Sequence, residues 1–341
     1  MRQLSDFCMK RTDITAEIFL PAFGLRNTHA QSLINSSAFR RRIVGKRSKA
    51  LLDAEQDWTV DGGDGIRLLG HYSKQSTKSR GLVILFHGWE GSSRSNYIVA
   101  AGGMLFDQGF DVFRLNFRDH GDTHHMNTGI FHSCRLDEVI HALQDIQQRT
   151  NASNWALSGY SLGGNFALRV ALSAPDAGLS LKQVIAVCPV VCPSNALKAM
   201  EDGPRGYESY FIHKWSKSMR LKQSLFPDSY EYKDWHELGS LRERTGYLAT
   251  RYYEFDSLEE YFDGYSIAGD RLKAVTIPTT ILTSEDDMVV PVSDFRDLPD
   301  NENIELLVTS HGGHCAFLKN WKMESLADDV IVERVLKNAD G

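Results

Sequence analysis

The segment Trp155–Leu168, WALSGYSLGGNFAL, places one serine among three glycines between two apolar runs. Gly159, Ser161 and Gly163 fit the pattern G-x-S-x-G, in which a strand turns sharply into a helix with the serine on the turn. The glycines are needed because the strained serine backbone leaves no room for side chains beside it. The pattern predicts Ser161 as a nucleophile; an ordinary glycine-rich turn is the alternative interpretation.

A serine hydroxyl is a poor nucleophile near neutral pH, so Ser161 needs a base and an acid that orients the base. In sites of this kind the acid and then the histidine follow the serine along the chain, each after a later strand. The apolar run that starts at Ile277 ends in Glu285, Asp286 and Asp287, which are therefore three candidates for the acid.

The last apolar run ends in SHGGH and offers two candidate bases, His311 and His314. The chain has 12 histidines, so the position after the last strand carries the argument rather than the residue type. We favour His314, because the two glycines before it let the loop bring the ring back over the edge of the sheet.

Attack on an acyl carbonyl creates a negatively charged oxygen that needs hydrogen-bond donors already aimed at it. The backbone N–H of Leu162, directly after the serine, is one predicted donor. The N–H of Trp89, in the loop HGWEGSS after an apolar strand, is the second. These two groups are the predicted oxyanion hole.

Strands that alternate with helices must position these residues. Continuously apolar runs such as Gly81–Phe86 are typical of strands buried on both faces of a parallel sheet. Segment 133–149 has apolar residues at helical spacing. The alternation runs from about Gln56 to Pro189 and resumes near Ile277. It predicts an α/β fold with a mostly parallel central sheet flanked by helices.

Between these two blocks the composition changes, because aromatic residues and helical spacing replace strands. We therefore predict three parts: an N-terminal arm (1–55), a core (56–190 and 269–341) and an inserted helical cap (191–268). Aromatic-rich surfaces near a site usually contact something, so the cap is expected to line the substrate pocket. A packing domain with no role in substrate choice is the alternative.

Five motifs in order, HGWEGSS, NFRDHGDT, GYSLGGN, EDDMVVP and SHGGHCAF, resemble the α/β-hydrolase superfamily. The N-terminal stretch PAFGLRNTHAQS is similar to the opening arm of its subfamily 4, the YheT-like esterases related to the eukaryotic ABHD hydrolases. The resemblance covers about Phe19–Leu336. It implies Ser161 as nucleophile, His314 as base, Asp287 as its partner, and ester hydrolysis without a cofactor.

The acid is the least settled member of this set. The spacing D-x-V-V-P after Asp287 resembles the acid turn of the family, which favours Asp287 over Asp286. Met288, however, stands where the family tends to have proline, and Ser32 stands where its arm has threonine. The choice between the two aspartates therefore stays open at this point.

The composition of the chain limits the kinds of partner and the location that we expect. The formal charge of −6 argues against a nucleic-acid partner, which would favour a basic face. The N-terminus lacks the apolar core of a signal peptide, and no apolar run approaches the length of a membrane span. We therefore expect a cytoplasmic protein. Its five cysteines are few and odd in number, and we expect reduced thiols.

Two stretches invite other interpretations. RDHGDTHH concentrates ligand types for zinc or manganese, namely Asp119, His120, Asp122, His124 and His125. It matches no standard metal spacing, so we expect Asp119 or His120 to shape the pocket or the loop instead. The basic stretch Arg40–Lys49 suits an acidic surface, but a solvated arm is favoured because no aromatic residues interleave it.

The sequence therefore predicts a serine hydrolase that cleaves a small ester, with an apolar group, through an acyl-enzyme intermediate. A thioesterase or acyltransferase would use the same residues, and a binding protein that kept the triad is a rival from another class. A metal-dependent hydrolase is the third alternative. The sequence does not specify the natural ester or the oligomeric state.

Overall fold

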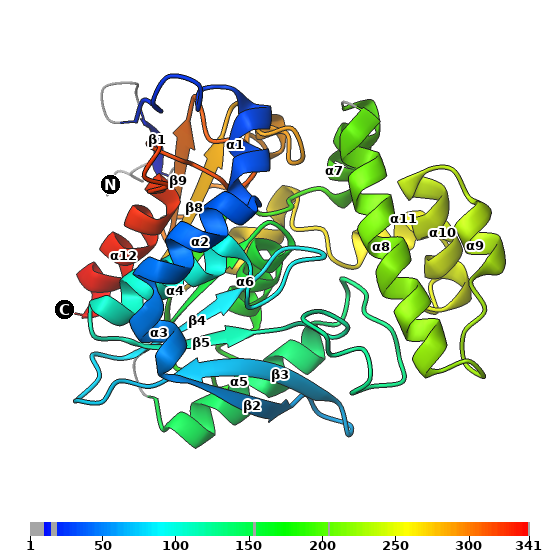
Figure 1. Cartoon of the computed structure of the whole chain (residues 1–341), viewed down its shortest axis with the longest axis horizontal. Coiled ribbons are helices and arrows are strands. Elements are labelled where there is room, and N and C mark those ends of the chain that lie inside the picture. Colours follow the sequence, from blue (N-terminus) through cyan, green and yellow to red (C-terminus); the bar gives the residue numbers. More distant parts are fainter. Residues whose placement is uncertain (1–9, 15–18, 153–154, 204, 340–341) are drawn as a thin grey trace, which may run out of the picture.

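A computed structural model describes residues 10–14, 19–152, 155–203 and 205–339, and its centre is a nine-stranded sheet (Figure 1). Along the sheet the strand order is β1-β9-β8-β7-β6-β4-β5-β3-β2. The strands are β1 (Lys10–Ile14), β2 (Glu55–Asp61), β3 (Arg67–Ser73), β4 (Leu82–Phe86), β5 (Asp111–Leu115), β6 (Trp155–Tyr160), β7 (Leu181–Val187), β8 (Thr279–Ser284) and β9 (Ile304–Thr309).

The predicted mostly parallel sheet is confirmed. Neighbouring strands from β1 through β9, β8, β7, β6 and β4 to β5 pair parallel. The two antiparallel pairs are β5 with β3 and β3 with β2. Strands β4, β6 and β8 are buried along their whole length, which explains the unbroken apolar sequence LVILF of β4. The carboxyl ends of the parallel strands consequently share one edge of the sheet.

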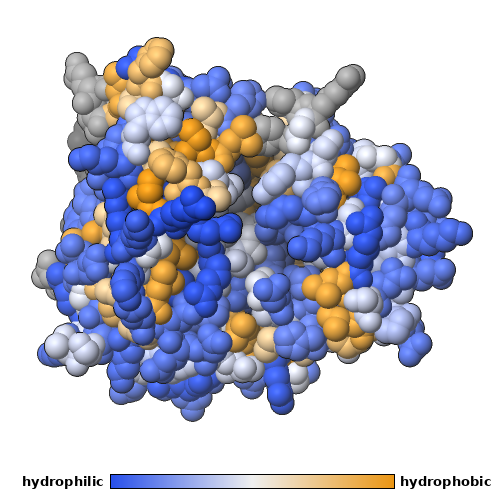
Figure 2. All heavy atoms as spheres, viewed as in Figure 1, coloured by the Kyte–Doolittle hydropathy of each residue, from blue (hydrophilic) through white to orange (hydrophobic). Residues whose placement is uncertain are grey.

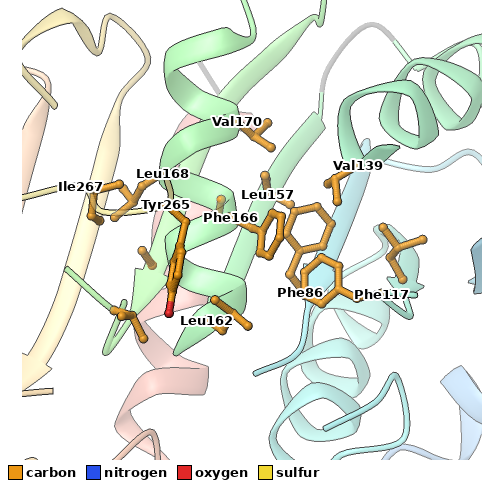
Figure 3. Close-up of a cluster of buried hydrophobic side chains, with 14 of the residues drawn as sticks. Phe86, Phe117, Val139, Leu157, Leu162, Phe166, Leu168, Val170, Tyr265 and Ile267 are labelled. Atoms are coloured by element: carbon orange, nitrogen blue, oxygen red, sulfur yellow. The ribbon is translucent and has the colours of Figure 1, made fainter. Parts of the chain in front are cut away.

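Helices cover both faces of the sheet, and each side has its own apolar core. Helices α4 (Asn96–Asp107) and α12 (Leu326–Ala339) pack on one face, and α5 (Leu136–Thr150) and α6 (Leu162–Ser173) on the other. Figure 3 shows the second core, where Phe86 of β4, Phe117 and Phe166 of α6 meet. The rings of Phe117 and Phe166 stack at 4.7 Å. This packing holds α6, and with it the turn that begins at Ser161.

The N-terminal arm is more structured than its sequence suggests. Strand β1 extends the sheet beside β9, and three helices follow: α1 (Thr28–Asn35), α2 (Ala38–Arg47) and α3 (Lys49–Asp53). The expectation of a solvated basic arm is wrong for Arg40, whose side chain is fully buried 3.7 Å from Asp328 of α12. A pattern of charges could not reveal this partner, because it lies 288 positions further along the chain.

Between β7 and β8 the chain forms a helical layer at the right of Figure 1. Its members are α7 (Pro193–Asp202), α8 (Arg205–Leu225), α9 (Lys233–Glu237), α10 (Leu241–Arg251) and α11 (Leu258–Asp263). Two short 3₁₀ helices, η1 (Gly269–Ala274) and η2 (Val292–Phe295), flank β8. No helix in the described residues is long and apolar enough to cross a membrane.

Candidate active site

Ser161 lies on the turn between β6 and α6, with φ 55° and ψ −119°, a conformation that side chains rarely adopt. A Cβ atom added to Gly159 would lie 2.1 Å from the carbonyl oxygen of Gly163. One added to Gly163 would lie 2.4 Å from the carbonyl oxygen of His87. Both glycines of the motif are therefore required by close backbone approach, and the serine alone projects from the turn.

The structure brings Ser161, His314 and Asp287 together. The Ser161 hydroxyl lies 2.8 Å from His314 Nε2, and His314 Nδ1 lies 3.0 and 2.9 Å from the two carboxylate oxygens of Asp287. The Asp287 carboxylate also accepts the backbone N–H groups of Val289 and Val290. With Nδ1–H donating to Asp287, Nε2 is free to accept the serine proton.

The other candidates for the acid and the base, Glu285, Asp286 and His311, do not belong to this chain of hydrogen bonds. Asp286 accepts the backbone N–H of Gly313 at 2.9 Å, so it holds the histidine loop rather than the imidazole. His311 Nδ1 is 3.9 Å from Asp286, and the Glu285 side chain is exposed. None of these three side chains has a hydrogen bond to Ser161 or His314 within the described residues.

The electrostatics of His314 follow from its surroundings. Burial alone lowers the pKa of His314, but the charge and hydrogen bond of Asp287 outweigh that effect and raise it above the ordinary value of imidazole. The carboxylate thus stabilises the protonated ring that would form when Ser161 gives up its proton.

The two predicted oxyanion donors belong to residues that border the same cavity. Leu162 is the first residue of α6, and its N–H has no partner inside the helix. In the part of the chain that the structure describes, neither this N–H nor that of Trp89 donates a hydrogen bond to the protein. Both residues line one cavity with Ser161 and His314. The positive end of the helix dipole of α6 adds to the attraction for an anion there.

That cavity has a volume of about 860 Å³ and extends from Ser161 beneath the helices between β7 and β8. Its inner wall is apolar and aromatic, from Leu197, Met200, Trp215, Tyr261, Phe262 and Val190. Glu90, Asp119 and Lys214 are charged members of its lining. Burial raises the pKa of Glu90 to about 7, against the opposing effect of Lys214. The wall suits an apolar group attached to the reacting carbonyl.

The histidine-rich loop after β5 ties the core to α8. Asp119 pairs with Lys222 at 2.8 Å, and both side chains are buried. The ring of His124 lies 2.7 Å from the hydroxyl of Ser218. His120 accepts the backbone N–H of Glu90 at Nε2. Burial lowers the pKa of His120 well below its ordinary value, so the ring is neutral, as an acceptor must be.

Two other clusters in the described residues contain metal-ligand atoms within 4.8 Å of one another. Glu55, Asp57 and His71 form the first, but the Glu55 carboxylate already pairs with arginines on neighbouring elements. His314 forms the second with Cys188 and Cys315, whose side chains are buried. The position of Cys188 beside His314 could not be predicted from the sequence, because Cys188 follows a different strand, β7.

The four cysteines other than Cys8, which lies outside the described residues, are free thiols. Burial raises the pKa of Cys188 well above its ordinary value and also raises that of Cys315. Both are therefore neutral, unreactive neighbours of the site rather than nucleophiles.

Sequence reasoning missed how the arm supports this site. The Thr28 hydroxyl donates to the backbone carbonyl of Asp286, and Ser32 accepts the backbone N–H of His314 at 3.3 Å. Gln31 bonds the backbone of Leu318 in both directions. These residues belong to the stretch NTHAQS. Its similarity to a family arm was the available signal, although it did not say what the arm touches.

Comparisons with known proteins bear on the family and the fold of this chain. The model of the family described as "Serine aminopeptidase, S33" matches residues 77–317. The Escherichia coli protein named "Putative esterase YheT" is 24% identical over 308 residues, which cover 88% of this chain and 87% of that protein. The Bos taurus protein named phospholipase ABHD3 is 20% identical over 347 residues, 98% of this chain and 81% of its own length.

Among solved structures, the α/β hydrolase GrgF from Penicillium sp. sh18 superimposes with a TM-score of 0.54 at 17% identity. The match covers 84% of this chain and 98% of that one. A likeness at this identity shows the fold alone, and it confirms the predicted α/β-hydrolase fold.

Proposed function

Because the chain belongs to the S33 family of α/β hydrolases, we propose that it hydrolyses carboxylic esters, with Ser161 as nucleophile, His314 as base and Asp287 as orienting acid. The observation that carries this proposal is the continuous line of contacts from the Ser161 hydroxyl through both nitrogens of His314 to the Asp287 carboxylate. Relatives named esterase and phospholipase support an ester as the substrate.

The reaction has two halves. The Ser161 oxygen attacks the acyl carbon while its proton moves to His314 Nε2, and the carbonyl oxygen becomes an oxyanion held by the N–H groups of Trp89 and Leu162. The tetrahedral intermediate collapses, the alcohol takes the proton from His314 and leaves, and Ser161 keeps the acyl group. Water then gives a proton to His314 and attacks the acyl carbon, which releases the carboxylic acid and restores the serine.

We assign helices α7–α11, within segment 191–268, to a cap that selects the substrate. The apolar cavity wall that they supply supports an ester with an apolar acyl or alcohol group. The arm (1–55) and the core (56–190 and 269–341) complete the proposed division. No cofactor takes part in these steps.

The principal test compares two serines that lie three residues apart in the chain. Ser161→Ala should reduce hydrolysis of p-nitrophenyl butyrate by at least about a thousandfold, because the residual rate comes only from binding and the oxyanion donors. Ser158→Ala is the matched control. Its hydroxyl is fully buried in β6 and has no hydrogen-bond partner within the described residues, so its loss should leave the rate nearly unchanged.

A fluorophosphonate probe should label the native protein and not the Ser161→Ala variant. Amino-acid p-nitroanilides, assayed in parallel, separate an esterase from the aminopeptidase after which the family is described. Thioester and alcohol acceptors separate the thioesterase and acyltransferase alternatives. Absence of labelling would instead favour a binding protein, and full activity of Ser161→Ala would refute the nucleophile.

A further inference from the structure

Exposed apolar side chains concentrate on one part of the surface. Nine large hydrophobic residues of the described chain are exposed, and five of them lie in or against the N-terminal arm: Leu20, Phe23, Leu33, Phe39 and Trp321. Phe23 is 89% exposed, and the indole N–H of Trp321 donates to its backbone carbonyl, so these two residues lie side by side. Scattered single apolar residues need no explanation, whereas a cluster of this kind marks an interaction surface.

The same arm carries a strong positive charge. Residues 19–52 contain seven lysines and arginines and no aspartate or glutamate. Since the whole chain has a formal charge of −6, the rest of it carries −13. Only Arg40 of the seven is buried. Arg41, Arg42 and Lys46 are exposed on α2 and have no ion-pair partner among the described residues.

Apolar and basic groups share one face of this region. Phe39, Arg42 and Lys46 are three and four residues apart on α2, so they project from the same side of the helix. In the view of Figure 2, apolar side chains gather over α1 and strongly hydrophilic ones lie beside them over α2. An apolar surface bordered by lysine and arginine suits the boundary between lipid tails and anionic headgroups.

This face adjoins the mouth of the catalytic cavity. His29, Leu33 and Ser36 of α1 and its C-terminal cap, spaced four and three residues apart, all line that cavity. Across the opening, Tyr210 of α8 lines it too and is another of the nine exposed hydrophobic residues. An ester that lies in a lipid layer could therefore enter the cavity without crossing water.

We propose that residues 19–52, together with Trp321, dock this protein on a lipid surface that carries anionic headgroups, with the mouth of the cavity facing the lipid. Binding itself does not depend on catalysis, and only the delivery of a lipid-borne ester rests on the function proposed above. The interpretation of the basic stretch changes for a physical reason: the aromatic residues absent from Arg40–Lys49 are supplied by Phe23 and Trp321 from other parts of the chain.

Vesicle flotation tests the surface directly. The Ser161→Ala protein should float with vesicles of phosphatidylcholine and phosphatidylglycerol in equal amounts, and at least about tenfold more weakly with phosphatidylcholine alone. Binding to the anionic vesicles should weaken as NaCl rises from about 0.05 to 0.5 M, because salt screens the headgroup charge. Equal binding to both vesicles, or none to either, would refute the proposal.

Two double variants separate the apolar and the basic contributions. Phe23→Ser with Phe39→Ser, and Arg42→Glu with Lys46→Glu, should each weaken the partition onto anionic vesicles by at least about tenfold. The matched control is Leu221→Ser with Leu225→Ser, which removes exposed apolar side chains from α8 and should bind like the parent. Parent-like binding by both arm variants would overturn the proposal.

Activity and self-association supply the remaining controls. With Ser161 restored, the arm variants should hydrolyse soluble p-nitrophenyl butyrate at the parent rate, because the changed side chains lie outside the cavity, and lose activity only on vesicle-borne esters. If the soluble ester is not cleaved by the parent either, the proposed function fails while vesicle binding is judged separately. Two results would refute lipid docking. The first is a dimer in ultracentrifugation that the double variant Phe23→Ser with Phe39→Ser no longer forms. The second is binding to an oligonucleotide in place of vesicles.

Discussion

The backbone at Ser161 carries strain of about 1–3 kcal/mol, the usual cost of a side chain held at such dihedral angles. The surrounding structure compensates for it. The N–H of Ser161 donates to the carbonyl of Val187 on β7, and its own carbonyl accepts the N–H of Asn165 in α6. The residue is thus fixed from both sides, and its hydroxyl reaches His314 without any rearrangement.

The substitution Asp287→Asn tests whether Asp287 is the acid that orients His314. The rate should fall by about 10³–10⁴-fold, because an amide can hold His314 in the wrong tautomer. Asp287 raises the pKa of His314, so the acid limb of the native profile, where the neutral base is lost, lies above about pH 6.5. Without the carboxylate, burial lowers that pKa and only the smaller effect of Cys188 opposes it, so the acid limb of kcat/KM should move to lower pH.

Asp286→Asn is the matched comparison for the same profile. The asparagine oxygen can still accept the N–H of Gly313, so we expect less than about a tenfold loss and no movement of the acid limb. Reversed results for the two variants would assign the acid to Asp286.

Helix α8 is one of the elements that join the helical layer to the core, and it does so along one line of its surface. Lys214, Ser218 and Lys222 are four residues apart and therefore face the same way. Lys214 donates to the carbonyl of Glu90 at 2.7 Å, and Ser218 and Lys222 reach the loop after β5. These contacts hold the loop that carries Trp89 and Glu90 in place against the wall of the cavity.

Lys222→Met measures how much this attachment contributes. The ammonium group is fully buried and bonds Asp119 and the carbonyls of His124 and Asn127, so its removal leaves a buried carboxylate unpaired. We expect the free energy of unfolding in urea to fall by about 3–5 kcal/mol. Lys198→Met, at an exposed pair with Asp202 on α7, should change it by less than about 1 kcal/mol. Similar small changes for both would show that α8 is held by its apolar contacts alone.

At the scale of the whole molecule, the parallel sheet assembles the site. Ser161 follows β6, Asp287 follows β8 and His314 follows β9, so all three leave the sheet at the edge where parallel strands end. Thr28 and Ser32 of the N-terminal arm form hydrogen bonds with the two loops that contain Asp287 and His314. The candidate site is therefore assembled from four separate parts of the chain.

Dialysis against EDTA tests whether the activity depends on a bound metal ion. Because the proposed reaction uses only serine, histidine, aspartate and backbone N–H groups, kcat/KM should stay within about twofold of its starting value. Loss of activity that zinc or manganese restores would favour the metal-dependent alternative. Manganese or zinc added to the untreated protein should likewise give no increase.

The sequence alone determined the features that depend on local chain geometry. Glycines at 159 and 163 around one serine encode the sharp turn, because only glycine tolerates backbone atoms so close to its α-carbon. Apolar runs without polar interruption encode strands buried on both faces, and their order along the chain predicts where the acid and the base must follow. The fold and the position of Ser161 could therefore be predicted from the printed letters.

The tertiary structure decided what depends on partners far away in the chain. Asp286 and Asp287 are adjacent and chemically identical, and only the path of the backbone after β8 turns the second toward His314 and the first toward Gly313. The burial of Arg40 against Asp328 is equally invisible in a pattern of charges. Side-chain direction and long-range pairing arise from packing, which no local spacing specifies.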